Sequence, residues 1–136
     1  MTKHRIILNP ASGRGTAESV VPEIIRLMQE RDLSYDLVRT ERPWHAAELA
    51  QQAVADGVDV VVAAGGDGTS NEVLNGLMIA RKNLGDHGTA MGVLSVGQGN
   101  DFAFGVGVPK DLAAACDVLA AGKRLEGARC ARQLMR

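Results

Sequence analysis

The sequence predicts an α/β fold in which a mostly parallel β-sheet lies between two layers of helices, as a three-layer sandwich. Three observations lead to this prediction. Short apolar runs alternate with segments of helical periodicity, the 136 residues suit one domain, and glycine-rich polar loops follow three of the apolar runs. Strands that are separated by helices pair in parallel, and both faces of a parallel sheet are covered.

The first half of the chain contains two predicted strand–helix units. The apolar run RIILN at 5–9 is typical of a buried strand, and residues 16–31 carry apolar side chains at helical spacing. YDLVR at 35–39 predicts the second strand. The alanine-rich segment 44–56 predicts the second helix, and Gly57 ends it, since glycine is common just after a last helical turn.

The second half repeats the same alternation. The apolar run at 58–64 predicts a third strand, and a helix is expected at 70–82 after the GGDG turn. A fourth strand is expected at 90–96. The last helix is expected at 109–121, because proline is favourable in a first helical turn. The tail at 122–136 is basic and weakly patterned.

The composition limits the classes of function. Apolar residues make up 46% of the chain and aromatic residues only 3%, so the core must be aliphatic. A formal net charge of −1 gives no reason to expect nucleic acid as a partner. Cys116 and Cys130 lack zinc-site spacing, and Cys116 is expected to be a small buried residue. The sequence shows neither a secretory signal nor an apolar run of membrane-spanning length, which predicts a cytoplasmic protein whose membrane contact is at most peripheral.

The glycine-rich loops predict where a ligand binds. Ligands of open α/β sheets bind outside the carboxyl ends of the strands. The loops PASGRG at 10–15, GGDGTSNE at 65–72 and GQGND at 97–101 all follow strands, so they meet at that edge. Thr40, at the end of the second strand, is expected at the same edge.

The GGDGT stretch suits an anion. Glycine lets successive backbone N–H groups point into one cavity, and a helix that begins after the turn adds partial positive charge, which together favour phosphate. Thr69 and Ser70 can cap that helix or donate to a phosphate oxygen. Asp67 fits if a magnesium ion, a sugar hydroxyl or a backbone donor lies beside it. The alternative is an ordinary Asp-Gly turn in which Asp67 bonds only its own backbone.

The helix after GGDGT carries a polar stripe. Asn71, Glu72 and Asn75 are expected near its start, where they could contact a nucleotide or a second substrate. For Glu72 the alternative is a favourable charge in the first turn of the helix. Asn100 and Asp101 are expected to order their own loop. Three apolar residues of the helix are expected in the core: Val73, Leu74 and Leu77.

The histidines and the tryptophan give weaker signals. His45 is expected to have a local capping or packing role rather than that of a general base, and His4 and His87 are expected at the surface. Trp44 is expected to pack at the start of its helix, with stacking on a base as the alternative. The chain shows no Ser-His-Asp arrangement and no cluster of His and Cys.

Four stretches carry a resemblance to a known family. They are NPASGRG at 9–15, the region 40–45 that leads into HAAELA, GGDGTSNEVLNGL at 65–77 and GVLSVGQGNDFAFGVGVP at 92–109. Together they make the chain resemble the catalytic domain of the diacylglycerol kinase family, specifically the bacterial lipid kinases related to sphingosine and ceramide kinases. The resemblance implies a Rossmann-like domain related to the nucleotide-binding domains of NAD kinases and phosphofructokinases. It also implies phosphoryl transfer from ATP with Mg²⁺ to a lipid hydroxyl, diacylglycerol-like or sphingoid, at the membrane surface.

The resemblance also implies the site residues. Asp67 is the expected catalytic residue, and the metal ligands stay open. Ser95 and Gln98 depart from the usual Pro and Thr of the family, and Phe104 stands where a basic residue is frequent. The expected nucleotide-binding residues are Asn9, Ser12, Gly13, Thr40, Gly66, Asp67, Gly68, Thr69, Asn71, Glu72, Gly97 and Gln98.

The resemblance covers only the first part of such a kinase. Family members continue into a β-rich domain that supplies part of the active site, so we expect residues 1–136 to form the ATP-binding domain alone. An apolar surface left uncovered would favour homo-oligomers. Two alternatives stay open: a kinase of a soluble substrate such as NAD, against which TSNEVLNGL argues, and a non-catalytic nucleotide-binding module.

Overall fold

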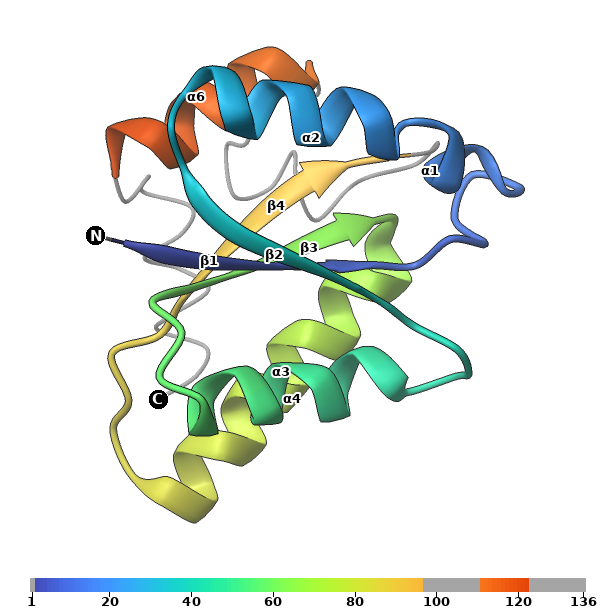
Figure 1. The fold of residues 1–136 in the computed structure, drawn as a ribbon. Helices are drawn as coiled ribbons and strands as arrows, with labels where there is room; N and C mark the ends of the chain where they lie inside the picture. Colours follow the sequence, from blue (N-terminus) through green and yellow to red (C-terminus); the bar gives the residue numbers. More distant parts are fainter. Residues whose placement is uncertain (1, 97–110, 123–136) are drawn as a thin grey trace.

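The computed structural model describes residues 2–96 and 111–122, which form a three-layer α/β sandwich (Figure 1). The middle layer is a four-stranded parallel sheet with the strand order β2-β1-β3-β4. Its strands are β1 (Lys3–Leu8), β2 (Ser34–Arg39), β3 (Val60–Gly65) and β4 (Ala90–Ser95). The predicted fold class and all four predicted strands are therefore confirmed, with ends that differ by one or two residues.

Helices cover both faces of the sheet (Figure 1). One face carries α1 (Thr16–Ser19), α2 (Val21–Glu30) and α6 (Leu112–Ala121), and the other carries α3 (His45–Ala55) and α4 (Asp67–Leu84). In the part of the chain that the structure describes, no helix combines the length and apolar character needed to cross a bilayer.

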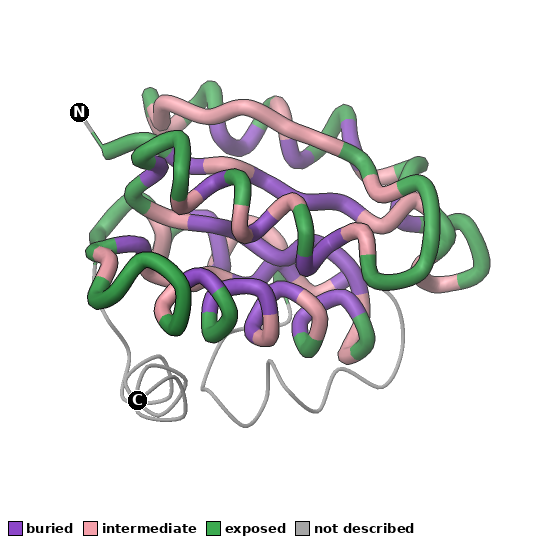
Figure 2. The backbone as a smooth tube through the Cα atoms, turned by 90° about the horizontal axis from the view of Figure 1, so that it is seen from below, coloured by how far each residue is buried: buried purple, intermediate pink, exposed green. Residues whose placement is uncertain are grey.

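The core is divided by the sheet into two aliphatic layers, because successive side chains of a strand point to opposite faces. In β1, Ile6 and Leu8 pack toward α2 and α6, whereas Ile7 packs toward α3 and α4. Burial is greatest along β1 and β3 and the inward turns of the helices, whereas the edge strand β2 is only half-buried (Figure 2). The predicted core residues of α4 are confirmed, since Val73, Leu74 and Leu77 are all buried.

The helix predicted over 16–31 is divided in two. Val20 lies outside both α1 and α2, with φ −95° and ψ 0°, and Pro22 stands at the start of α2. A proline cannot donate to the carbonyl four residues before it, and its ring clashes with that carbonyl. The apolar periodicity runs through this point unbroken, which is why the pattern alone predicted one helix.

Glycine lets α3 and α4 pack closely. A Cβ added at Gly76 would lie 2.3 Å from the carbonyl oxygen of Ala47, which is too close for any side chain. The facing side of α3 consists of small residues as well, since Ala46, Ala50 and Ala53 are buried there. This contact fixes α4, and with it the turn that precedes α4, against the rest of the domain.

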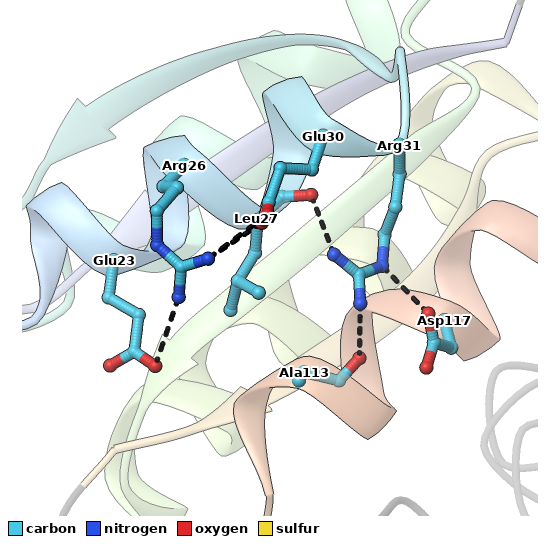
Figure 3. Close-up of polar contacts among 7 residues, drawn as sticks. All are labelled: Glu23, Arg26, Leu27, Glu30, Arg31, Ala113 and Asp117. Atoms are coloured by element: carbon cyan, nitrogen blue, oxygen red, sulfur yellow. Dashed lines mark hydrogen bonds and ion pairs between the residues drawn. The ribbon is translucent and has the colours of Figure 1, made fainter.

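An arginine ties α6 to α2 (Figure 3). Arg31 Nε lies 2.7 Å from an oxygen of Asp117, and its other nitrogens donate to the carbonyls of Leu27 and Ala113. Beside this ion pair, Cys116 is fully buried, as predicted, and burial raises the pKa of its thiol. Arg26 pairs with two glutamates of α2 in the same view, but these groups are exposed and contribute little to stability.

Candidate functional site

The strand order marks the carboxyl ends of β1 and β3 as the expected place of a ligand crevice. The chain passes from β1 outward to β2 and then returns to β3 on the other side of β1, so the direction of the sheet order reverses at this point. The loops that follow β1 and β3 lie beyond the carboxyl ends of these strands, which is where open α/β sheets bind their ligands. These loops are 9–15 and the GGDGT stretch, as the sequence predicted.

The first loop is held by its own backbone. The N–H of Asn9 donates to Ala64 of β3 at 3.1 Å, so Asn9 lies directly beside the end of β3. The Oδ1 atom of Asn9 accepts from the N–H of Ala11 at 3.0 Å, and its backbone oxygen accepts from Ser12. Asn9 therefore shapes the turn with its oxygen, and its side-chain NH₂ is the group suited to a ligand.

Three successive residues of this loop have left-handed backbones: Gly13, Arg14 and Gly15, with φ 61°, 58° and 90°. Glycine adopts this conformation without strain, but arginine does not. Arg14 is exposed there. It was not among the residues singled out from the sequence. A cation between two glycines, SGRG, was the available signal.

The GGDGT turn is tighter than predicted. Gly66 is the extended N-cap residue, and α4 begins at Asp67 rather than near Ser70. The first helical bond runs from the N–H of Ser70 to the carbonyl of Gly66 at 3.1 Å. The first-turn N–H groups of Asp67, Gly68 and Thr69 consequently have no carbonyl partner within the helix, and they carry the positive end of its dipole.

Gly65 brings the two loops together. A Cβ at this last residue of β3 would lie 2.5 Å from Oγ1 of Thr69 and 2.8 Å from Oγ of Ser12. The two hydroxyls, which are 57 positions apart in the sequence, therefore converge on the space that the missing side chain leaves. Thr69 is 3% exposed, and its Oγ1 has no hydrogen-bond partner among the described residues. A buried hydroxyl without a partner is costly, so this Oγ1 atom is suited to a ligand group.

Thr40 lies at the same edge, one strand further out. Its N–H donates to the carbonyl of Leu8 at 2.9 Å, so β2 stays paired with β1 to its end. The neighbouring Arg39 makes a two-oxygen ion pair with Glu18 of α1, at 2.9–3.1 Å. This pair lowers the pKa of Glu18 through its hydrogen bonds and links β2 to the helix that follows loop 9–15.

Glu72 has a different place from the one expected. It lies in the second turn of α4, because the helix begins early, and its Oε1 accepts from the N–H of Ala46 at 3.3 Å. Its carboxylate thus caps α3, where a negative charge is favourable. Asn71 is exposed, and Asn75 donates to the carbonyl of Asn71 at 2.8 Å, so the predicted polar stripe of α4 is present.

The histidine predictions were partly wrong. His45 has the expected local role, since its Nδ1 accepts from the N–H of Glu41 at 2.9 Å. His4 is 1% exposed rather than at the surface, and its Nδ1 lies 3.1 Å from the carbonyl of Ser34. His87 is half-buried and contacts the carbonyl of Leu77 through Nε2. Packing between β-strand ends and helix ends buries these residues, which a single-sequence pattern does not show.

The packing expected for Trp44 was wrong as well. Its side chain is 59% exposed, and its backbone has a left-handed φ of 66° at the N-cap of α3.

Two predicted nucleotide-binding residues, Gly97 and Gln98, lie outside the described part of the chain. So do Asn100 and Asp101, which were expected to order their own loop, and Phe104, which departs from the family pattern. Within residues 2–96 and 111–122, no group of three or more His, Cys, Asp and Glu side chains could hold a metal ion. A magnesium ion at Asp67 would take phosphate oxygens and water as further ligands, which is its usual manner of binding beside nucleotides.

Comparisons with known proteins confirm the family resemblance. A family model described as the diacylglycerol kinase catalytic domain matches residues 3–130. Diacylglycerol kinase of Staphylococcus saprophyticus is 34% identical over 118 residues, which are 87% of this chain and 37% of that protein. Diacylglycerol kinase of Staphylococcus aureus is 36% identical over the same share of this chain and 36% of its own length.

Solved structures show the same fold. A crystal structure of a diacylglycerol kinase from Bacillus anthracis superposes with a TM-score of 0.73 at 24% identity, over 90% of this chain and 40% of that one. The chain thus spans little more than a third of the length of the curated relatives it matches. Because the family model covers nearly all of residues 1–136, the chain belongs to the diacylglycerol kinase catalytic domain family.

Proposed function

We propose that the chain is the ATP-binding domain of a lipid kinase, which transfers the γ-phosphoryl group of ATP to a lipid hydroxyl, diacylglycerol-like or sphingoid. The observation that carries this proposal is the convergence of the Ser12 and Thr69 hydroxyls over Gly65, beside the first turn of α4. The family membership supports the reaction class.

The residues present fit nucleotide phosphates with magnesium. The N–H groups at the start of α4 and the orphan hydroxyl of Thr69 would hold phosphate oxygens, and Ser12 would close the cradle from the other loop. Asp67, the first residue of α4, would hold magnesium directly or through water. Magnesium neutralises the charge of the phosphates when it is bound.

The chain's own contribution to the reaction is mainly positioning. Phosphoryl transfer needs aligned groups and neutralised charge rather than covalent help from the protein. The close contact of Gly76 with Ala47 fixes α4 against α3. It keeps the first turn of α4 in place before the nucleotide arrives. Localisation in the cytoplasm and assembly into homo-oligomers stay predictions.

Isothermal titration of the chain with ATP, with and without Mg²⁺, tests the proposal. We expect magnesium-dependent binding that Asp67→Ala weakens more than it lowers the melting temperature. Asp86→Ala is the matched control, because Asp86 is an exposed aspartate just beyond the far end of α4. Equal losses of binding and of thermal stability in Asp67→Ala would contradict the role of Asp67, and no binding by the wild type would contradict the nucleotide site.

The acceptor is tested separately by turnover. With labelled ATP, phosphorylation of dioleoylglycerol or sphingosine in mixed micelles supports the lipid-kinase proposal. Phosphorylation of NAD instead would assign the soluble-substrate alternative. Nucleotide binding without transfer to any of these acceptors would indicate the non-catalytic module.

A further inference from the structure

Trp44 is an unusual residue for this fold. It is the single tryptophan of the chain, and its side chain is 59% exposed at the start of α3. A large aromatic side chain normally contributes to a fold by being buried. Here most of the ring surface stays in contact with solvent, so the packing of the domain does not account for a tryptophan at this position.

The backbone makes the position more unusual. Trp44 has φ 66° and ψ 0°, in the left-handed region that glycine adopts without strain. A bulky residue in this conformation costs free energy, and strained residues of this kind cluster where proteins bind their ligands. The side chain therefore neither fits its backbone well nor gains burial in exchange.

The surroundings of Trp44 are fixed by other residues. The N–H of His45 donates to the carbonyl of Arg42 at 3.2 Å, and Ala47 donates to the carbonyl of Trp44 itself at 3.1 Å. Glu72 of α4 accepts from the N–H of Ala46 at 3.3 Å. The tryptophan is thus held on a rigid helix start, although its own ring contributes little to that rigidity.

Trp44 also lies on a particular side of the domain. It follows β2, whose carboxyl end shares an edge with the loops of the nucleotide crevice. Because β2 is the outermost strand beyond β1, its loop flanks the crevice and does not line the space between β1 and β3. An exposed aromatic at the rim of this edge suits a large flat partner better than a ligand within the crevice.

We propose that Trp44 is an interfacial anchor that inserts into the headgroup region of the lipid surface that presents the acceptor. This inference rests on the proposed lipid-kinase function, because a lipid hydroxyl must be reached at the boundary between membrane and water. The amphipathic indole ring prefers that boundary, with its apolar body in the lipid and its N–H near water. Contact there brings the carboxyl edge of the sheet, and with it the phosphate cradle, against the membrane.

The charges near Trp44 favour insertion of the ring over electrostatic adsorption. Arg42 pairs with Glu48, and Arg39 pairs with Glu18, so these nearby arginines are already neutralised. Glu41 adds a further exposed acidic residue. Binding through Trp44 should accordingly depend only weakly on salt, unlike binding through a polybasic patch.

The single tryptophan gives the test a direct readout. Vesicles of phosphatidylglycerol and phosphatidylethanolamine with dioleoylglycerol should shift the emission of the chain to shorter wavelength, and brominated lipids should quench it. Trp44→Gly should lower vesicle binding in a flotation assay by about tenfold, because roughly 60 Å² of apolar surface would no longer be transferred from water into the lipid. Its melting temperature should stay the same or rise, since glycine suits the left-handed backbone.

Controls separate this inference from general stickiness and from the proposed function. Leu84→Ser removes another exposed apolar side chain, which is 63% exposed. Leu84 is the last residue of α4, whereas the candidate site lies at the start of this helix, so the variant should leave vesicle binding unchanged. Emission that shifts with Mg·ATP but not with vesicles would assign Trp44 to the nucleotide and overturn the proposal. An unshifted emission with intact Mg·ATP binding would overturn the anchor alone. Insertion of Trp44 by a chain that binds no nucleotide would overturn the proposed function and leave the lipid contact standing.

Discussion

Substitution of Gly65 by alanine is the sharpest test of the two-loop cradle. The added Cβ would lie 2.5 Å from Oγ1 and 2.9 Å from Cβ of Thr69, and 2.8 Å from Oγ of Ser12. Thr69 is anchored in the first turn of α4, so the clash cannot be relieved by a side-chain rotation alone. Overpacking of this kind costs about 1–3 kcal/mol. For a domain of this size, each kcal/mol of lost stability lowers the melting temperature by roughly 3–6 °C.

The same substitution should impair the ligand site. Pushing the hydroxyls of Ser12 and Thr69 apart removes the convergence that the phosphate needs, so Mg·ATP affinity should fall about tenfold or more, as for the loss of a hydrogen bond to a charged group. Urea unfolding and isothermal titration measure the two effects. In the double variant Gly65→Ala/Thr69→Ala, the 2.5 Å contact is gone. Part of the stability should return, whereas nucleotide affinity should not, because a phosphate-binding hydroxyl is missing.

Gly88→Ala is the matched control for this experiment. Gly88 lies between α4 and β4, and an added Cβ there would have no atom within 4 Å. Its stability should change by less than about 0.5 kcal/mol, with unaltered Mg·ATP affinity. The reasoning would be refuted if Gly65→Ala unfolded at the same urea concentration as Gly88→Ala, or if it bound Mg·ATP as tightly as the wild type.

Three further predictions concern the scaffold. Gly76→Ala should lower the free energy of unfolding by roughly 3 kcal/mol or more, and by more than Gly65→Ala, because its Cβ would meet the backbone of Ala47 rather than side chains. Chemical denaturation measures this difference. A variant as stable as the wild type would refute the close packing of α3 and α4. The hydrogen bond from Arg5 lowers the pKa of Asp56, so this pair stabilises the fold above the unfolded pKa of about 3.9 and its contribution is lost as the pH falls through the folded pKa. The difference in urea midpoint between the wild type and Asp56→Asn should accordingly be present near neutral pH and shrink below about pH 4; a difference that persists at low pH would contradict the ion pair. Cys116 is buried and the pKa of its thiol is raised, so it should resist iodoacetamide in the folded chain and react in urea. Peptide mass spectrometry measures the labelling. Rapid labelling under native conditions would contradict the burial of the α6 residue Cys116.

The order of the elements could be predicted from local patterns. Apolar runs of strand length and helical periodicity both depend on neighbouring residues, so β1 to β4 and the helices between them were anticipated with small errors at the ends. The larger errors had local causes that the hydrophobic pattern does not express. Pro22 divided one predicted helix, and the glycine-rich turn allowed α4 to begin at Asp67.

The grouping of the candidate site residues at one edge of the sheet could also be predicted. Parallel strands bring their following loops to one edge, so Asn9, Ser12, Thr40 and the GGDGT stretch could be grouped from the sequence alone. The roles of single side chains could not. Glu72 turned out to cap α3 through Ala46, because a side chain's partner depends on how two helices pack.

By itself, the sequence determined the fold class, the edge of the sheet at which loop 9–15 and the GGDGT stretch meet, and the residue types that are offered there. These follow from short-range periodicity, turn chemistry and the alternation of strands and helices. Only the tertiary structure decided that Ser12 and Thr69 meet over Gly65, that His4 is buried and that Trp44 is exposed on a left-handed backbone. The physical reason is that burial and contact are set by packing between segments distant in the chain, where a few tenths of an ångström decide which atoms can be neighbours.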